Sequence, residues 1–184
     1  GCRFCQAGMI YRPVRERNPD DVLALAAGAL AATGYKDVSF LSLSTGDYSQ
    51  LDTLLSSFSK IHGSQHVAIS IPSFRAGSLN HSAMASIQKI RKTGFTIAPE
   101  AGSQRLRDVI NKNITEADII HTVSTAFDLG WNLIKVYFMI GLPTETQDDV
   151  EQIVALVKRL KKLGKTKGQA NPKIKKKSIP PRIN

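Results

Sequence analysis

Glycines recur along this sequence at a nearly constant spacing, and each follows a segment with the apolar period of a helix. They are Gly34, Gly63, Gly94, Gly130 and Gly164, at intervals of 29, 31, 36 and 34 residues. Glycine suits the left-handed position just past a helix end. We therefore expect helices that end at these glycines, so that most of the chain repeats one structural unit.

Helical and strand patterns alternate within this repeat. The helical apolar sets are Val22, Leu25, Ala26, Ala29 and Leu30; Leu51, Leu54, Leu55, Phe58 and Ile61; and Val150, Ile153, Val154, Val157 and Leu160. Short β-prone runs follow the first four glycines, at residues 37–43, 66–71, 95–99 and 132–140. Helix-start signals agree with this pattern; they are Asn18-Pro19, Thr115–Asp118 and Thr146–Asp149.

A strand followed by a helix about every 30 residues predicts an α/β fold with a parallel sheet. The strands are apolar on both faces, as expected when helices cover them. Four strands are too few for a closed barrel. A small open sheet and a piece of a larger barrel both fit this pattern.

Polar loops follow the four predicted strands. They are Ser44-Thr45-Gly46-Asp47, Pro72-Ser73-Phe74-Arg75, Glu100-Ala101-Gly102-Ser103 and Gly141-Leu142-Pro143-Thr144-Glu145. Helix capping alone explains such residues in any single loop. In parallel α/β folds, however, these loops share one rim, where ligands bind. Three carboxylates on that rim, from Asp47, Glu100 and Glu145, suit a ligand that carries an ammonium group, a ribose and a base.

The net charge of +10 is concentrated at one end of the chain. Residues 158–184 contain eleven Lys or Arg and no acidic residue, whereas residues 1–157 contain fourteen basic and fifteen acidic residues. Such a block is typical of a solvated or disordered arm and, less often, of an RNA-binding one. We therefore predict a core over residues 1–164 and a basic, disordered tail over 165–184.

Two classes of protein are excluded by what the sequence contains. No apolar run approaches the roughly 20 residues of a membrane span, and residues 1–20 lack a signal-peptide pattern. Two cysteines cannot build a disulfide framework. We expect no membrane partner and a cytoplasmic location.

The only two cysteines, Cys2 and Cys5, form a Cys-x-x-Cys motif at the start of the chain. By itself this motif fits half a zinc site, a thiol redox pair, or no function at all. A thioredoxin-like site needs a strand before the motif and a helix directly after it. Here the motif is followed by the basic stretch of residues 11–17 instead.

The opening segment GCRFCQAGMIYRPVRERNP resembles the cluster-binding loop of radical S-adenosylmethionine (SAM) enzymes. It is most similar to the subgroup often fused to a cobalamin-binding-like domain. The family motif is Cys-x-x-x-Cys-x-aromatic-Cys; Cys2 and Cys5 match its second and third cysteines, and Phe4 matches its aromatic residue. The first cysteine is expected at the third residue before Gly1, so the resemblance implies a chain that begins inside its own motif.

Further segments resemble the same family in the same order. They are SLSTGDYS, TIAPEAGSQRLRDVINKNIT and IKVYFMIGLPTET. The resemblance covers residues 1 to about 163 and implies a partial TIM-type (β/α)6 barrel. The four predicted strands correspond to its second to fifth strands, with the first upstream and the last downstream of this chain. The sequence departs from the family after residue 164, where Lys and Pro replace the expected strand.

The resemblance also implies cofactors, partners and a reaction. A [4Fe–4S] cluster and SAM are the expected cofactors, with cobalamin as a further candidate in the whole protein. An external electron donor such as flavodoxin or ferredoxin reduces the cluster. SAM is then cleaved to a 5′-deoxyadenosyl radical, which abstracts hydrogen from an unidentified substrate. Two thiolates do not complete the cluster site, so we expect this chain alone to be inactive.

Each candidate site residue receives a role from the resemblance. Cys2 and Cys5 are expected to bind iron, and Phe4 to lie near the adenine. Gly46 and Asp47 are expected to meet the SAM ammonium group. The remaining candidates are Ser70, Ser73, Arg75, Glu100 and Ser103 for the ribose or carboxylate, and Gly141, Leu142 and Pro143 for the adenine wall through backbone contacts.

Two functions other than radical SAM chemistry also stay open. The chain fits an α/β module that binds RNA through its basic tail, with the cysteines incidental. It also fits a zinc or thiol-redox protein that uses the Cys-x-x-Cys motif. Neither alternative explains why the strand-end segments match the family in order.

Overall fold

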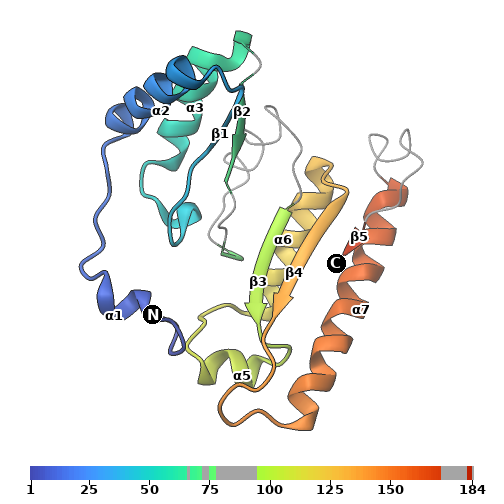
Figure 1. Ribbon diagram of the computed structural model, residues 1–184. Coiled ribbons are helices and arrows are strands. Elements are labelled where there is room, and N and C mark those ends of the chain that lie inside the picture. The colour runs from blue at the N-terminus through green and yellow to red at the C-terminus, as the bar shows by residue number, and fades with distance from the viewer. Residues whose placement is uncertain (66, 72–74, 78–94, 171–181, 184) are drawn as a thin grey trace. The chain divides into compact units, whose positions relative to one another are not determined.

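The computed structural model describes residues 1–65, 67–71, 75–77, 95–170 and 182–183 (Figure 1). The chain forms two compact units, and the single core expected over residues 1–164 stays a prediction. One unit combines Gly1–Arg12 with Gly94–Asn184, and the other is Pro13–Thr93.

The Pro13–Thr93 unit pairs two short parallel strands with two helices. Its elements are α2 (Pro19–Thr33), β1 (Asp37–Ser39), the 3-10 turn η1 (Thr45–Asp47), α3 (Leu51–His62), η2 (Gly63–Gln65) and β2 (Ala68–Ser70). Val38 of β1 is in register with Ile69 of β2, and the strands run parallel. Leu55 and Phe58 of α3 are almost fully buried, as is Ile69, so α3 supplies much of this small core.

The unit that contains both termini is a second parallel sheet with helices. Its elements are α1 (Ala7–Ile10), β3 (Phe95–Glu100), α5 (Gln104–Val109), α6 (Glu116–Leu129), β4 (Leu133–Phe138), α7 (Gln147–Ala170) and β5 (Arg182–Ile183). The strand order is β3-β4-β5, and both pairings are parallel. In Figure 1 the arrowheads of β3 and β4 lead to the loops before α5 and α7, which places both loops at the carboxyl edge of the sheet.

The expected α/β class with parallel sheets is confirmed, and the helix-start signals are observed. Asn18 caps α2 by accepting a hydrogen bond from the backbone of Asp20 at 2.9 Å. Thr115 and Asp118 form a reciprocal capping box at the start of α6. Gly34 and Gly130 end α2 and α6 in the left-handed conformation, with φ of 71° and 93°. The partial barrel stays a prediction.

Two of the glycines differ from the expectation. Gly63 does follow the end of α3, but with a right-handed φ of −61° in place of the left-handed one, and the chain continues into η2. Gly164 lies inside α7, which continues to Ala170. A glycine inside a helix costs only about 1 kcal/mol, and the lysines around Gly164 are good helix formers. Gly94 lies outside the described residues.

The basic tail is more ordered in its described parts than the sequence predicted. Residues 165–170 continue α7, and Arg182–Ile183 form β5 beside Leu133–Ile134 of β4. The boundary expected at residue 164 therefore marks a change of composition and not the end of regular structure. Within the described chain, no helix has the length and apolarity needed to cross a membrane.

The apolar face predicted for α2 differs from the observed one. Leu23 and Ala26 are buried, whereas 59% of the Leu25 surface is exposed. The predicted set combined residues from both sides of a helix that is apolar almost all round, so its period gave no unique inner face.

Candidate functional site

The first residues of the chain form a tight turn that carries both cysteines. The backbone amide of Cys5 donates to the carbonyl of Cys2 at 3.1 Å, the hydrogen bond that closes a four-residue turn. Cys2 is half-buried and Cys5 is exposed, and both are free thiols. The turn therefore presents two unpaired sulfur ligands from one short segment.

The cysteine turn is fixed to the end of α5 and the residues that follow it. The amide of Arg3 donates to the carbonyl of Ile110 at 2.9 Å, and its guanidinium donates to the carbonyl of Val109 at 2.5 Å. The Asn111 side-chain amide donates to the carbonyl of Gly1 at 2.8 Å. A cation at the last carbonyls of a helix is favourable, so Arg3 has a structural role on α5.

Phe4 and Glu100 lie on either side of one lysine. The Lys112 ammonium group is 3.0 Å from a Glu100 carboxylate oxygen and 5.9 Å from the centre of the Phe4 ring. Glu100 ends β3 and has a positive φ of 68°. The structure thus brings the cysteine turn, Phe4 and the carboxyl end of β3 together through Lys112.

A buried arginine stabilises the loop between β3 and α5. No surface of Arg107 is exposed. Its guanidinium donates to the carbonyls of Ala101 (3.0 Å), Gly102 (2.9 Å) and Ile114 (3.2 Å), and to the Gln104 side chain (3.0 Å). Burial lowers the pKa of Arg107 from its ordinary value. The fixed, multi-donor geometry of one guanidinium thus serves three backbone carbonyls and one side chain at the same time.

Gly102 brings this loop into direct contact with the backbone of α7. A Cβ atom at this position would lie 2.2 Å from the backbone nitrogen of Ile153 and 2.5 Å from the carbonyl carbon of Gln152. The next residue, Ser103, caps α5 by accepting a hydrogen bond from the amide of Leu106 at 3.1 Å. The β3–α5 loop is therefore packed tightly on both sides.

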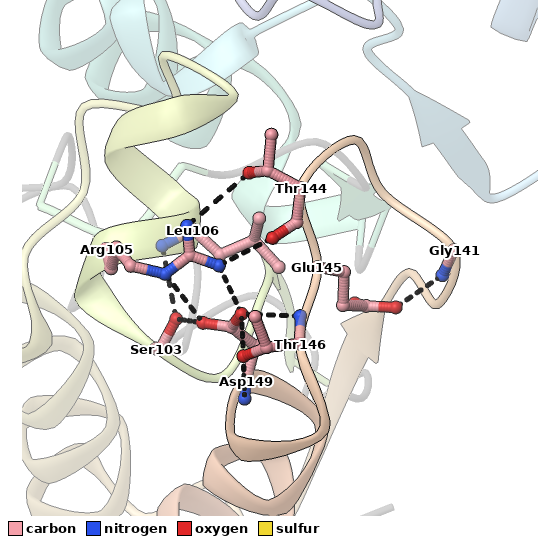
Figure 2. A network of polar contacts seen from close by, with 8 residues as sticks. All are labelled: Ser103, Arg105, Leu106, Gly141, Thr144, Glu145, Thr146 and Asp149. Carbon is pink, nitrogen blue, oxygen red and sulfur yellow. Dashed lines mark hydrogen bonds and ion pairs between the residues drawn. The ribbon is translucent and has the colours of Figure 1, made fainter.

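Asp149, in the first turn of α7, is the centre of a polar network (Figure 2). Its carboxylate accepts short hydrogen bonds from Arg105 and Ser103, and one of 2.7 Å from the Thr146 hydroxyl. Arg105 also donates to the carbonyl of Thr144 at 2.8 Å. The network links the loop before α5 to the loop before α7. Ser103, predicted to meet SAM, thus has a hydroxyl that is already engaged in the protein.

The hydrogen bonds from Arg105, and then those from Ser103 and Thr146, hold the pKa of Asp149 well below its ordinary value. A carboxyl group whose pKa is lower in the folded than in the unfolded protein stabilises the fold at pH values above its unfolded pKa, which is 3.8 for an ordinary Asp. This stabilisation is lost as the pH falls below 3.8 toward the folded-state pKa. We expect Asp149→Asn to be less stable at neutral pH and to lose less further stability on acidification.

Unfolding by guanidinium at several pH values between 7 and about 3 measures this effect. Asp148→Asn is the matched control, because it removes a carboxylate from the same helical turn and leaves the network intact. If Asp149→Asn and the parent lose stability in parallel below pH 4, the network does not carry the acid dependence.

The predicted adenine wall is a tight turn after β4. Gly141 has a φ of 88°, and its amide donates to a Glu145 carboxylate oxygen at 2.6 Å. The amide of Glu145 in turn donates to the carbonyl of Leu142 at 3.0 Å. The Leu142 side chain is buried in a cluster with Ala101, Leu106 and Ile110. Only the backbone of Leu142 is therefore available to a ligand, and Pro143 beside it is exposed.

In the Pro13–Thr93 unit, Gly46 and Asp47 lie in the turn η1. Gly46 is buried, and the exposed Asp47 carboxylate accepts a hydrogen bond from the Ser44 hydroxyl at 2.6 Å. The adjacent Tyr48 hydroxyl donates to the carbonyl of Arg17 at 2.7 Å. The Ser49 amide donates to Glu16 at 3.1 Å. These contacts hold the turn in place and leave Asp47 accessible.

The other candidates of this unit are Ser70, at the end of β2, and Ser73 and Arg75, which follow it in the sequence. Ser70 is half-buried, and its carbonyl accepts a hydrogen bond from the amide of Phe40 at 3.0 Å. Arg75 is also half-buried. Ser73 lies outside the described residues. Ser70 therefore extends the β1–β2 pairing through its backbone, and its predicted role toward a ligand stays a prediction.

Three functional or scaffold residues were not predicted from the sequence: Arg105, Arg107 and Lys112. For Lys112 a signal was available, because it lies between Asn111 and Asn113, which both have positive φ (54° and 51°). Asparagine tolerates this conformation better than most residues. The Asn-Lys-Asn sequence therefore indicated a tight turn that directs the lysine.

The donor set at the cysteine turn fits part of an iron–sulfur site. Thiolates are the ligands of [4Fe–4S] clusters, and both cysteines are free. Within the described residues, no group of three or more His, Cys, Asp or Glu side chains is arranged to hold a metal ion. The turn therefore provides two thiolate ligands and not a complete site.

Comparisons with known proteins agree on one family. The family model described as the Radical SAM superfamily matches residues 1–157. An uncharacterized protein of Methanocaldococcus jannaschii is 40% identical over 176 residues, covering 95% of this chain and 38% of that protein.

Two further relatives have named activities. A tRNA-2-methylthio-N(6)-dimethylallyladenosine synthase of Clostridium novyi is 25% identical over 86% of this chain and 37% of its own length. The ribosomal protein uS12 methylthiotransferase RimO of Clostridioides difficile is 23% identical over 87% of this chain and 38% of its own length. The chain thus spans little more than a third of the length of these relatives.

Proposed function

Because the chain belongs to the radical SAM superfamily, whose members are enzymes, we propose that it is the cofactor-binding core of an enzyme that cleaves SAM reductively. The observation that carries this proposal is the cysteine turn, in which Cys2 and Cys5 are free thiols on a segment fixed to α5. They supply two of three thiolates. The family motif has one more cysteine, four positions before the one that Cys2 matches.

Cys2 and Cys5 would hold a [4Fe–4S] cluster, which when bound would supply the one-electron reduction needed for reductive cleavage of SAM and hydrogen abstraction. The residues of this chain bind and orient the cofactors. Phe4 covers one side of the site. The accessible carboxylate of Asp47 receives the SAM ammonium group, which its charge favours. Gly141 is exposed and its amide is bonded to Glu145, so we assign its contact with the adenine to its carbonyl.

The remaining candidates have secondary roles in this proposal. Arg75 and Ser70, with Ser73 beside them in the sequence, contribute to the ribose or carboxylate contacts. Ser103 acts indirectly, by fixing the loop before α5. Cobalamin stays a candidate cofactor of the whole protein, and flavodoxin or ferredoxin a candidate electron donor. Free thiols suit a reducing compartment such as the cytoplasm.

The names of the relatives bear on the substrate. One is named for a tRNA adenosine and the other for a ribosomal protein, although each aligns with most of this chain. We infer that residues 1–157 perform the chemistry common to these proteins, and that the rest of each polypeptide selects the substrate.

The test is anaerobic reconstitution of the full-length protein with iron and sulfide, followed by reaction with SAM and dithionite. We expect about four irons per chain and production of 5′-deoxyadenosine. Zinc bound at one equivalent, without SAM cleavage, would favour the zinc or thiol-redox alternative. A folded protein with no bound metal and no cleavage would reject the proposal.

A second candidate function is RNA contact through α7. Lys158, Lys161, Lys162 and Lys165 are exposed, and their spacing places them on one side of the helix. Two neighbouring cations instead bind α6, through Arg159–Glu116 and Lys167–Asp128 ion pairs. One side of α7 is thereby attached to α6, and another side carries the four exposed lysines. Exposed lysines can neutralise phosphate groups and so bind a nucleic-acid backbone.

Replacing these four lysines by glutamine is expected to weaken RNA binding and to reduce its dependence on salt, because fewer phosphate contacts release fewer counterions. Fluorescence anisotropy with a labelled tRNA at several salt concentrations measures both quantities. Arg159→Gln is the matched control, since it removes a cation that is paired with Glu116. Equal salt dependence in all three proteins would exclude α7 as an RNA surface.

A further inference from the structure

Lys112 and Glu100 form an ion pair that is largely shielded from solvent. The ammonium and carboxylate groups are 3.0 Å apart, and only 14% and 15% of the two side chains are exposed. Solvent and salt screen such a pair less than a surface pair. The Lys112 ammonium also lies 5.9 Å from the centre of the Phe4 ring, inside the range of a cation–π contact.

The backbone conformation around Lys112 and at Glu100 positions the two side chains for the ion pair. Lys112 lies between two asparagines of positive φ, and its amide donates to the carbonyl of Arg107 at 2.9 Å. Glu100 itself has a φ of 68°, which is uncommon for a residue other than glycine. The amide of Met139 donates to the Glu100 carbonyl at 2.7 Å, which holds this strained residue at the sheet edge. Strained residues of this kind cluster at functional sites.

The segment that carries Lys112 also carries the cysteine turn. Arg3 binds the carbonyls of Ile110 and Val109, and Asn111 binds the carbonyl of Gly1. The ion pair is therefore attached to the same short support as Cys2 and Cys5. A movement of Lys112 would be transmitted to the turn through Phe4 and through Asn111.

We propose that Lys112 and Glu100 are a positioning pair for the cysteine turn, which hold Phe4 and the two thiols in place and balance the charge beside them. This inference rests on the proposed function only in naming the group that the thiols bind. In this proposal Glu100 serves as the ion-pair partner of Lys112. The sequence had instead predicted that Glu100 contacts SAM.

Because Lys112 and Glu100 carry opposite charges, removing one or the other is expected to shift the reduction potential of a nearby cluster in opposite directions. Without Lys112, the carboxylate of Glu100 remains as an uncompensated negative charge, and a nearby cluster becomes harder to reduce. Without the charge of Glu100, the ammonium of Lys112 remains, and the cluster becomes easier to reduce. The potentials of iron–sulfur clusters follow the net charge around them. A merely structural loss would instead move both single variants in the same direction.

The first measurement needs no cluster. In the unloaded full-length protein we compare the rate at which iodoacetamide alkylates Cys2 and Cys5, resolved by mass spectrometry. Lys112→Met is expected to raise the rate at the half-buried Cys2 at least about threefold, because the turn opens more often, whereas the exposed Cys5 serves as the internal reference. Lys112→Arg, which keeps the charge, is expected to stay near the parent. Unchanged alkylation in Lys112→Met, with its fold verified by circular dichroism, overturns the proposal.

The second measurement is the midpoint potential of the reconstituted cluster. Lys112→Met is expected to lower it, Glu100→Gln to raise it, and the double variant to return toward the parent. A tenfold change in the one-electron reduction equilibrium corresponds to 59 mV, which sets the scale of the titration. Shifts of equal sign in the two single variants overturn the proposal. If the parent binds no cluster, the proposed function fails, and the alkylation rates still decide the role of Lys112.

Discussion

Gly102→Ala is expected to destabilise the protein by about 3 kcal/mol or more, at the upper end of the cost of overpacking a core. The added Cβ would lie 2.2 Å from the nitrogen and 2.7 Å from the Cα of Ile153, both backbone atoms of α7. A helix backbone cannot rotate aside as a flexible side chain can, so either α7 or the β3–α5 loop must shift. Such a shift would also disturb the carbonyl of Gly102, which binds Arg107 at 2.9 Å.

Gly28→Ala is the matched control for this substitution. Gly28 lies inside α2, and no atom lies within 4 Å of a Cβ placed there. Alanine is favoured over glycine in a helix interior, so this variant is expected to be stabilised by about 0.5–1 kcal/mol. Guanidinium unfolding followed by circular dichroism measures both variants. A Gly102→Ala protein as stable as the parent would show that the loop and α7 are not in close contact.

Cys5→Ala is expected to abolish the activity of the full-length protein. The radical chemistry belongs to the cofactor, so loss of one thiolate should lower 5′-deoxyadenosine production below about a thousandth of the parent rate. The same variant should retain little iron after reconstitution and desalting. Cys2→Ala is expected to behave in the same way, since both thiols lie on one turn closed by the Cys5–Cys2 hydrogen bond.

Gln6→Ala controls for damage to the turn itself. Gln6 is exposed and adjoins Cys5, and its side chain offers no thiolate. We expect iron content and SAM cleavage near those of the parent. If Cys5→Ala keeps its iron and its activity, Cys5 is not a cluster ligand, and the match to the family motif is misleading at this position.

The sequence was sufficient to predict regular elements where a local rule decides the structure. The capping box of Thr115 and Asp118 depends on residues three apart, and it is observed. The left-handed end at Gly130 is also a local preference, and it is observed. The expectation that a helix ends at glycine was wrong at Gly164, which lies inside α7. The sequence around a glycine within a long helix does not differ from the sequence around a glycine that ends one.

The candidate site was less predictable, because its contacts join distant residues. Sequence reasoning placed Ser103 and Glu145 at a ligand, since both follow strands. The structure adds contacts that the sequence did not reveal, of Ser103 with Asp149, 46 residues away, and of Glu145 with Gly141, while their roles toward a ligand stay predictions. Lys112 was missed because its role depends on three residues of positive φ and on a contact with Phe4. Sequence periodicity and motif spacing describe neighbouring residues and therefore do not predict contacts between residues so far apart in the chain.

The surroundings of Arg107 restrict how this part of the chain can diverge during evolution. A lysine has a single nitrogen on a flexible stem, and it cannot reach the separate carbonyls of Ala101, Gly102 and Ile114 together. An apolar side chain would remove the Arg107 donors from the carbonyls of Ala101 and Gly102. Relatives that keep this loop length should therefore keep the arginine even where the surrounding surface has changed completely. That makes the position a useful marker for identifying distant members from sequence alone.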